Sequence, residues 1–323
     1  MRTIALAAVT TAVVLSAPLA DAGETLRWKW APGESSRLVM QQTMNMTMNG
    51  GPMGKINSST DQTMLMTWTV GDSAGDATPV SQSMDRIVMT MDGPMGQGFT
   101  YDSAAAEAPV GMAAMVAPMF DALVKADITL AVSPRGEVSE VTLPDELKDA
   151  FNRVPGGAMS TDMVTQLTQQ SMLKFPEQPL EVGDTWTETT KVSSPQMGAM
   201  QINVTYRYDG QREVDGRPVA AITPSLTMQV ADPNAQAMPV TFETRASSGE
   251  ILFDNEAGRL ISSRIDQTTD VVVSVQGNEM RNEIAQTTVV RLLKEGETPD
   301  LNGAADDEAA DEASLANPAM VTP

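Results

Sequence analysis

LVMQQTMNMTM, at residues 38–48, is the stretch that decides the fold class. Every second residue from Leu38 onward falls on one face, which carries four methionines together with Gln42. The opposite face carries Val39, Gln41 and the Thr and Asn residues that stand between the methionines. This period of two predicts a β-strand with one largely apolar face and one polar face.

The same alternation returns on both sides of this stretch. Residues 26–30, 63–70 and 87–91 each place apolar side chains at alternate positions. Two of the turns that separate the strands are nearly identical, MTMNGGPMG at residues 46–54 and MTMDGPMG at residues 89–96. Asn-Gly and Asp-Gly favour positive φ, so both turns are predicted to be hairpin loops of an antiparallel meander.

Helices are expected in the middle of the chain. Apolar residues from Met112 to Leu123 recur at helical spacing after Pro109. A hairpin around Pro134-Arg135-Gly136 follows, and then two helices, the second with Ser160 as its N-cap. Strands resume in the second half, at 186–193, 200–209, 217–230, 239–247, 250–254, 260–275 and 281–293.

The two ends of the chain differ from the β-rich core. A basic Arg2, an apolar run and a small-residue cleavage motif predict a signal peptide over residues 1–22, too short for a membrane span. From Glu295 to residue 323, eight acidic residues and no basic one predict a disordered tail. Between them we expect a first β-rich half at 23–143, a helical linker at 144–178 and a second β-rich half at 179–294. The signal predicts export, to a periplasmic or extracellular location, and no membrane span after its removal.

Composition narrows the chemistry. The 323 residues include no His and no Cys, which excludes an imidazole base, a thiolate nucleophile and ordinary zinc or haem ligation. A formal net charge of -21 disfavours nucleic acid as a partner. Carboxylates alone suffice for glycoside hydrolysis, but the acids are scattered and only 4% of residues are aromatic. We therefore expect no enzymatic activity, no cofactor and no metal.

Three phrases resemble a family of exported bacterial proteins whose function is not established. They are WAPGE at residues 30–34, PRGEV at 134–138 and FPEQPLEVGDTW at 175–186. Such proteins are similar in plan to the lipoprotein-carrier (LolA-like) half-barrel. The resemblance implies an α+β fold, mainly antiparallel β, with a curved half-barrel-like sheet and with the Met-rich helix and helical linker over its concave face. It also implies carriage of a hydrophobic ligand, or scaffolding, rather than catalysis.

Methionine is the most unusual feature of the composition, at 24 residues. Methionines fill a closed β core well because the side chain is unbranched and adaptable. They equally suit an internal groove that repacks around varied apolar ligands. A Met-x-Met pair on a strand also places two thioethers on one face, and thioethers select Cu(I). The four tryptophans fit either core packing or the rim of a ligand mouth.

We predict an exported, non-enzymatic protein that binds or carries a hydrophobic, lipid-like ligand in the cell envelope. The alternatives are a structural or interaction module with a closed Met-rich core, and a Cu(I)-binding protein. The identity of the ligand, the oligomeric state and whether the two halves share one sheet stay open. The residues predicted to line the ligand site are Met44, Met46, Met48, Met64, Met66, Met89, Met91, Met115, Met119 and Phe120.

Overall fold

The computed structural model describes residues 23–49, 54–73, 75–124, 126–152, 161–169, 171–194, 198–231, 240–275 and 278–301. Four predicted features lie outside these residues: the signal peptide at 1–22, the Gly50–Met53 part of the first hairpin loop, the Ser160 cap and the tail from 302 to 323.

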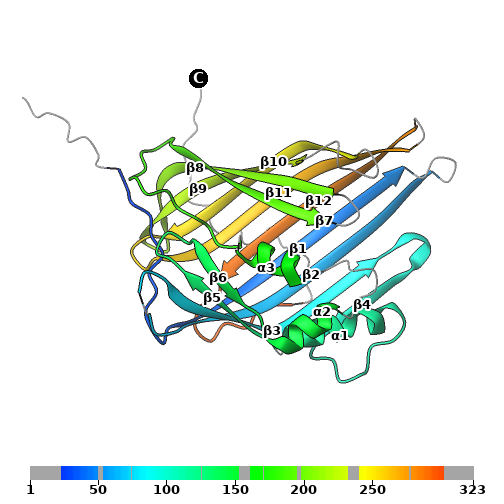
Figure 1. Cartoon of the computed structure of the whole chain (residues 1–323), viewed down its shortest axis with the longest axis horizontal. Coiled ribbons are helices and arrows are strands. Elements are labelled where there is room, and N and C mark those ends of the chain that lie inside the picture. Colours follow the sequence, from blue (N-terminus) through cyan, green and yellow to red (C-terminus); the bar gives the residue numbers. More distant parts are fainter. Residues whose placement is uncertain are drawn as a thin grey trace, which may run out of the picture.

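The described strands form one 12-stranded antiparallel sheet (Figure 1). The strands are β1 (Ser35–Asn49), β2 (Lys55–Val70), β3 (Thr78–Asp92), β4 (Gly98–Asp102), β5 (Asp127–Val132), β6 (Val138–Thr142), β7 (Thr185–Ser194), β8 (Gly198–Val214), β9 (Arg217–Val230), β10 (Val240–Asp254), β11 (Arg259–Val275) and β12 (Asn278–Leu292). Their order is β6-β5-β3-β2-β1-β12-β11-β10-β9-β8-β7, and β4 pairs with β3 outside this path.

The strand order shows how the two β-rich halves are related. The first strand, β1, pairs with the last, β12, from Leu38↔Leu292 to Met48↔Asn282. Because this pairing lies at the centre of the strand order, the two β-rich halves share a single sheet.

Three local predictions are corrected. Residues 26–30 are not a strand, although Leu26 and Trp28 are both buried. The two strands expected at 239–247 and 250–254 are one continuous strand, β10, because Ser248 and Gly249 pair with Asp266 and Ile265 and so continue the ladder between them. The short strand β4 has no counterpart among the predicted strands.

The sheet curves so that strands far apart in its order meet across the concave face. Val80 of β3 and Leu130 of β5 belong to the same buried cluster as Ile222 of β9 and Phe253 of β10. A flat sheet would hold these strands several strand spacings of about 4.8 Å apart. The mainly antiparallel α+β fold with a curved sheet is therefore confirmed.

Three α-helices lie on the concave side: α1 (Met112–Val124), α2 (Asp145–Asn152) and α3 (Thr161–Gln169). A 3₁₀ turn, η2 (Pro94–Gly96), connects β3 to β4 as the second predicted hairpin loop. Helix α1 packs on β3 and β4, whereas α3 contacts both β6 and β7. These two strands are the free edges of the sheet, so α3 lies at the seam between them. Among the described residues, no helix has the length and apolar character that crossing a membrane requires.

A small apolar cluster on the convex face holds residues that follow β12 against the sheet. Leu301 is buried and packs with Val39, Val88 and Leu293. Glu297 pairs with Arg291 at 2.7 Å. Residues 295–301, which the sequence assigns to the acidic tail, are therefore packed against the sheet, because Leu301 supplies an apolar contact that the acidic composition of the tail conceals.

Candidate functional site

Strand register decides which side chains line the concave face, since directly opposed residues of an antiparallel pair point to the same side. Leu38 lies opposite Met66, which lies opposite Met84. Met40 lies opposite Met64. We call these four methionines, Met40, Met64, Met66 and Met84, the near belt, because they adjoin the aromatic end of the sheet described below.

A row of amides follows the near belt along the strands. Gln42 lies opposite Gln62, and the row then steps by one position on this face, because Gln286 lies opposite both Met44 and Gln267. Gln286 donates a hydrogen bond to Thr288 at 3.1 Å and Gln267 donates one to Thr269 at 2.9 Å, in each case to the threonine two positions along its own strand. This glutamine row makes the middle of the concave face able to hydrogen bond.

Beyond Gln42 and Gln62 along the strands lies a second group of methionines, the far belt, formed by Met44, Met46, Met48 and Met91. Met44 and Met91 both lie opposite Thr60, while Met46 lies opposite Ser58 and Ile284. Both belts are therefore on one face of the sheet, as the alternation predicts.

The exposure of these side chains distinguishes the concave face from a closed core. All four far-belt methionines, together with Met40 and Met64, are half-buried, and only Met66 is buried. The fully buried apolar side chains instead gather at the aromatic end. The methionine rows are thus an accessible apolar surface.

Helix α1 brings together only part of the predicted site. Met64, Met89, Met119 and Phe120 pack in one cluster with Ile87 and Tyr101. Met115 does not join it, because its side chain is 79% exposed. The helix instead buries Ala113 and Ala117, whose small side chains allow its close approach to β3 and β4.

The convex face of the same strands is different in character. There Thr43 donates to Asp61 at 2.7 Å and Thr287 donates to Asp266 at 2.7 Å. At these positions the convex face carries threonine–carboxylate pairs where the concave face carries methionines, so the two faces differ in polarity.

An aromatic cluster closes one end of the curved sheet. Trp28 stacks on Trp30 with ring centroids 5.1 Å apart and meets Phe253 edge-on at the same distance. Phe253 contacts Phe175, and Phe175 contacts Trp186. The three phrases that carry the family resemblance thus converge here, although more than a hundred residues separate the first from the third.

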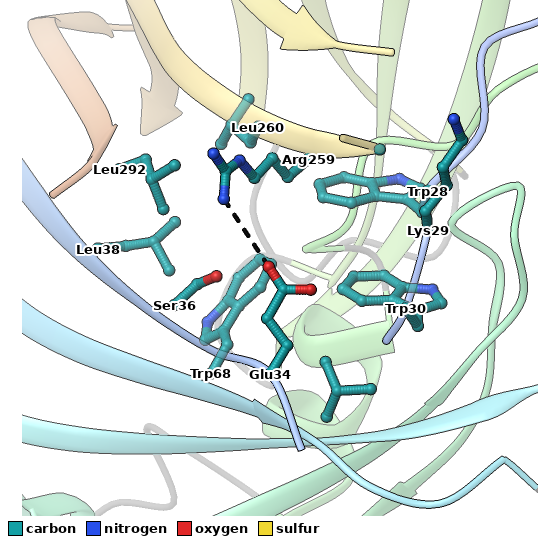
Figure 2. A pocket seen from close by; sticks show the side chains of 12 residues that line it. Trp28, Lys29, Trp30, Glu34, Ser36, Leu38, Trp68, Arg259, Leu260 and Leu292 are labelled. Atoms are coloured by element: carbon teal, nitrogen blue, oxygen red, sulfur yellow. Dashed lines mark ion pairs between the residues drawn. The ribbon is translucent and has the colours of Figure 1, made fainter. Parts of the chain in front are cut away.

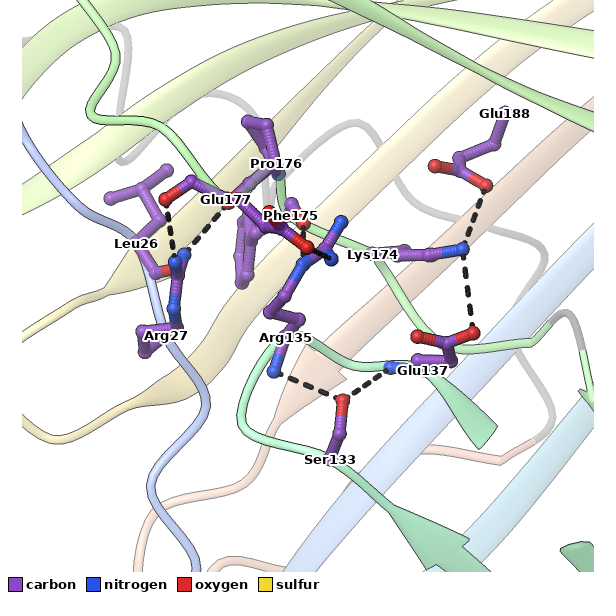
Figure 3. A network of polar contacts seen from close by, with 10 residues as sticks. All are labelled: Leu26, Arg27, Ser133, Arg135, Glu137, Lys174, Phe175, Pro176, Glu177 and Glu188. Atoms are coloured by element: carbon purple, nitrogen blue, oxygen red, sulfur yellow. Dashed lines mark hydrogen bonds and ion pairs between the residues drawn. The ribbon is translucent and has the colours of Figure 1, made fainter. Parts of the chain in front are cut away.

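A strap, residues 172–180, crosses the seam and is tied to both sides (Figure 3). Trp28 Nε1 donates to Leu173 O and Trp186 Nε1 donates to Lys174 O, each at 2.8 Å. Arg135 Nε donates to Phe175 O at 2.9 Å. The aromatic and basic residues of these segments therefore fasten the seam through their hydrogen bonds to the strap.

Charges cross the seam as well. Lys174 Nζ lies 3.9 Å from Glu137 beside β6 and 3.7 Å from Glu188 of β7 (Figure 3). Burial, with the Glu188 carboxylate as a second cause, raises the pKa of the neighbouring Tyr206 to about 12. Tyr206 is therefore neutral at physiological pH.

A pocket opens between the aromatic cluster and the near belt (Figure 2). It is small, with about 30 Å³ that the centre of a water-sized group can occupy, and part of it is continuous with solvent. Trp28 and Trp30 form one side, Leu38 and Leu292 the other, and Arg259 faces Glu34 across it. We call this site the tryptophan pocket; it is lined by Trp28, Lys29, Trp30, Glu34, Ser36, Leu38, Trp68, Val70, Gly258, Arg259, Leu260 and Leu292.

Three buried donors at the wall of this pocket have no hydrogen-bond acceptor among the described residues. They are Trp30 Nε1, Trp68 Nε1 and Arg259 Nε. The other two tryptophans, Trp28 and Trp186, both donate to the strap. The sequence analysis identified the tryptophans as possible residues of a ligand mouth. It did not connect them with Arg259, because Arg259 reaches the pocket only through a contact between distant parts of the chain.

The register places the Met64-x-Met66 pair opposite Met40 and Met84, but it places no methionine directly opposite Met44 or Met46. The direct neighbours of Met44 and Met46 on β2 and β12 are Thr60, Gln286, Ser58 and Ile284. Within the part of the chain that the structure describes, no group of three or more acidic ligands could hold a metal ion.

The fold and site define a class: an open, strongly curved antiparallel sheet with an accessible apolar concave face. The profile of the family of unknown function DUF6263 matches residues 75–258, and the chain belongs to this family. No curated protein matches the chain.

Solved structures offer distant likenesses. Lipovitellin, in a structure concerned with its lipid–protein interactions, is 12% identical with a TM-score of 0.46, over 82% of this chain but only 26% of the lipovitellin chain. This chain thus spans about a quarter of that protein. An exported protein of YmcC-like fold from Bacteroides fragilis is 10% identical, with 82% and 99% of the two chains covered and a TM-score of 0.28. An outer membrane channel from Pseudomonas putida is 8% identical, with 85% and 98% covered and a TM-score of 0.23. TM-scores below 0.5 assign no function.

Proposed function

We propose that this protein binds a hydrophobic, lipid-like molecule on the concave face of its sheet, as an exported and non-enzymatic carrier in the cell envelope. The observation that carries the proposal is the half-buried state of the two methionine belts. A contiguous apolar surface left accessible to water costs about 25 cal/mol for each Å², and such surfaces typically mark ligand grooves or interfaces.

The type of side chain supports a lipid-like ligand. Methionine has three flexible torsions and a polarisable sulfur, so a methionine-lined face fits chains of different shape. The glutamine row between the belts adds hydrogen-bonding groups that a purely apolar core would not tolerate without partners. A molecule with both an apolar chain and polar groups matches this pattern better than a pure hydrocarbon.

The alternative of a closed methionine core is less well supported. In a closed core, the methionines at mid-sheet would be as buried as Leu38, which is 2% exposed. Apart from the buried Met66, the methionines of the near and far belts instead keep intermediate exposure.

The test is ligand uptake by two double variants of strand β1. Met40→Gln with Met44→Gln makes the concave face polar, whereas Asn45→Gln with Thr47→Gln makes the same number of changes on the convex face. We expect the first variant to bind palmitate and methyl palmitate about tenfold more weakly, a loss of about 1.4 kcal/mol. The control variant should bind both as the unchanged protein does.

Native mass spectrometry measures the uptake, and urea unfolding checks that both variants are folded. If the protein takes up neither palmitate nor methyl palmitate, the concave face is a structural surface and the proposal is wrong. Equal affinity in both double variants would exclude the methionine belts as the binding surface.

A further inference from the structure

We propose that the tryptophan pocket receives the acidic head of the ligand, a carboxylate or a phosphate, while the apolar chain extends over the near belt. This inference rests on the proposed function and names the class of ligand: an anionic single-chain amphiphile.

The first argument is the set of unpaired donors. Trp30 Nε1, Trp68 Nε1 and Arg259 Nε are buried at the pocket wall and lack an acceptor among the described residues. A buried donor without a partner destabilises the fold, and more so when the group is charged. Because all three are donors, the group that would satisfy them is an acceptor, and an anionic oxygen is the strongest acceptor available.

The second argument is the local charge. The charged groups that face each other across the pocket are Arg259 and Glu34, whereas the Lys29 ammonium points away from it and donates to Glu256 O at 2.8 Å (Figure 2). The pocket is thus locally balanced in charge, although the chain carries a net charge of -21. An anionic head meets less repulsion there than over the rest of so acidic a protein, because the overall field repels anions.

The third argument is that Arg259 remains available. Its Nη1 lies 3.7 Å from Glu34 Oε1, which is an ion pair but too long for a hydrogen bond. The Glu34 carboxylate is 41% exposed and the Arg259 side chain 36% exposed. A ligand oxygen that forms a short, charge-assisted hydrogen bond with the guanidinium would therefore compete effectively with this loose pair.

The fourth argument is position. Leu38 and Trp68 line the pocket and lie on the same face of β1 and β2 as the near belt. Strands rise about 3.3 Å per residue, so the near belt begins about 7 Å from Leu38 and Met44 lies about 20 Å away. One acyl chain spans about half of a 30 Å bilayer core, so it would reach across the near belt to the glutamine row.

The experiment compares three probes that share one chain: palmitate, hexadecyl phosphate and methyl palmitate. The first two carry an acidic head and the third does not. Titration is followed by tryptophan fluorescence, since three of the four tryptophans line the pocket. The full exported protein is used throughout.

Three variants are expected to change the affinity for the two acids in different directions. Arg259→Gln should weaken binding of palmitate and hexadecyl phosphate at least tenfold while leaving methyl palmitate within twofold. Glu34→Gln should strengthen binding of both acids several-fold, because it removes the carboxylate that competes for Arg259. Trp68→Phe keeps the ring but removes the donor, so it should weaken the acids a few-fold and leave the ester unchanged. Whichever acid binds more tightly identifies the head as carboxylate or phosphate.

The outcomes separate this inference from the proposed function. If the unchanged protein binds methyl palmitate but Arg259→Gln retains the full preference for acids over the ester, the pocket does not receive the head. If no probe binds at all, the proposed function itself fails. Should Arg259→Gln not fold, the opposite effects expected of Glu34→Gln and Trp68→Phe on the acids still decide the question, and equal effects on acid and ester would overturn the inference.

Discussion

At the scale of single residues, the seam depends on a glycine that no other residue can replace. Gly136 adopts φ +85°, and an added Cβ would come within 2.1 Å of Leu173 O and 2.7 Å of Trp28 Nε1. These two atoms form the hydrogen bond that ties Trp28 to the strap. Both the backbone conformation and the contact therefore require glycine.

We predict that Gly136→Ala destabilises the protein by more than the 1–3 kcal/mol typical of backbone strain alone. The control is Gly33→Ala, since Gly33 also has positive φ, +80°, but a Cβ there would meet nothing within 4 Å. Urea unfolding of both variants separates strain from collision. Equal losses in the two variants would show that the close contact at the strap has no energetic weight.

A second residue-scale prediction concerns acid. Arg86 binds Asp102 through Nε at 3.0 Å and Nη2 at 2.6 Å, and this hydrogen-bonded pair lowers the pKa of Asp102 below its ordinary value. A carboxylate with a lowered folded pKa contributes stability above its unfolded pKa, near 3.9, and loses it as pH falls through the folded pKa.

Asp102→Asn should therefore cost about 1 kcal/mol at pH 7, a modest value because the pair is partly exposed to solvent. The difference from the unchanged protein should shrink below about pH 4. Urea unfolding from pH 7 to pH 3 measures it. Asp145→Asn is the control, since the Asp145 side chain is 90% exposed, and it should show no measurable effect. A cost at Asp102 that does not depend on pH would contradict this account.

At the scale of elements, the long strands were predictable because alternation is written directly into the sequence. The predicted face of residues 38–48 is the face that the register of β1 places toward the concave side. The prediction of a strand at residues 26–30 was wrong because alternate residues can be buried without the segment pairing with a neighbouring strand. Leu26 and Trp28 are buried by the strap and hairpins, with Trp28 N donating to Pro134 O at 2.7 Å.

Helix α1 shows what helical spacing leaves undetermined. Its methionines seemed to mark the inner face, yet Met115 points to solvent while Ala113 and Ala117 are buried. Ala113 and Ala117 allow the helix to lie close to β3 and β4, and the sequence does not reveal which face of the helix makes that approach. The tryptophan pocket could not be predicted from the sequence for a related reason, since only the tertiary structure brings Glu34 and Arg259 together.

We predict opposite behaviour for two residues of α1. Phe120 is 7% exposed and stacks on Tyr101 at 5.0 Å, so Phe120→Ala should destabilise the protein by about 3–5 kcal/mol. Met115→Ala should change stability by less than about 0.5 kcal/mol, because the side chain is exposed. Thermal and urea unfolding measure both, and a large loss at Met115 would mean that the helix presents a different face.

At the scale of the whole molecule, the buried core and the accessible face are separated along the strands. The aromatic end contains the largest cluster of buried side chains, and the strap and α3 connect the free edges there. The belts and the glutamine row occupy the concave face beyond it. The chain has no Cys and therefore no disulfide, so burial at the aromatic end stabilises the curvature that shapes the face.

The most direct test of the central claim, that the concave face binds a lipid-like ligand, is native mass spectrometry of the purified protein mixed with palmitate. The account predicts a complex of defined stoichiometry, about tenfold weaker in the Met40→Gln/Met44→Gln variant and unchanged in Asn45→Gln/Thr47→Gln. A folded protein that remains free of ligand, or a complex that is equally strong in both variants, would contradict it.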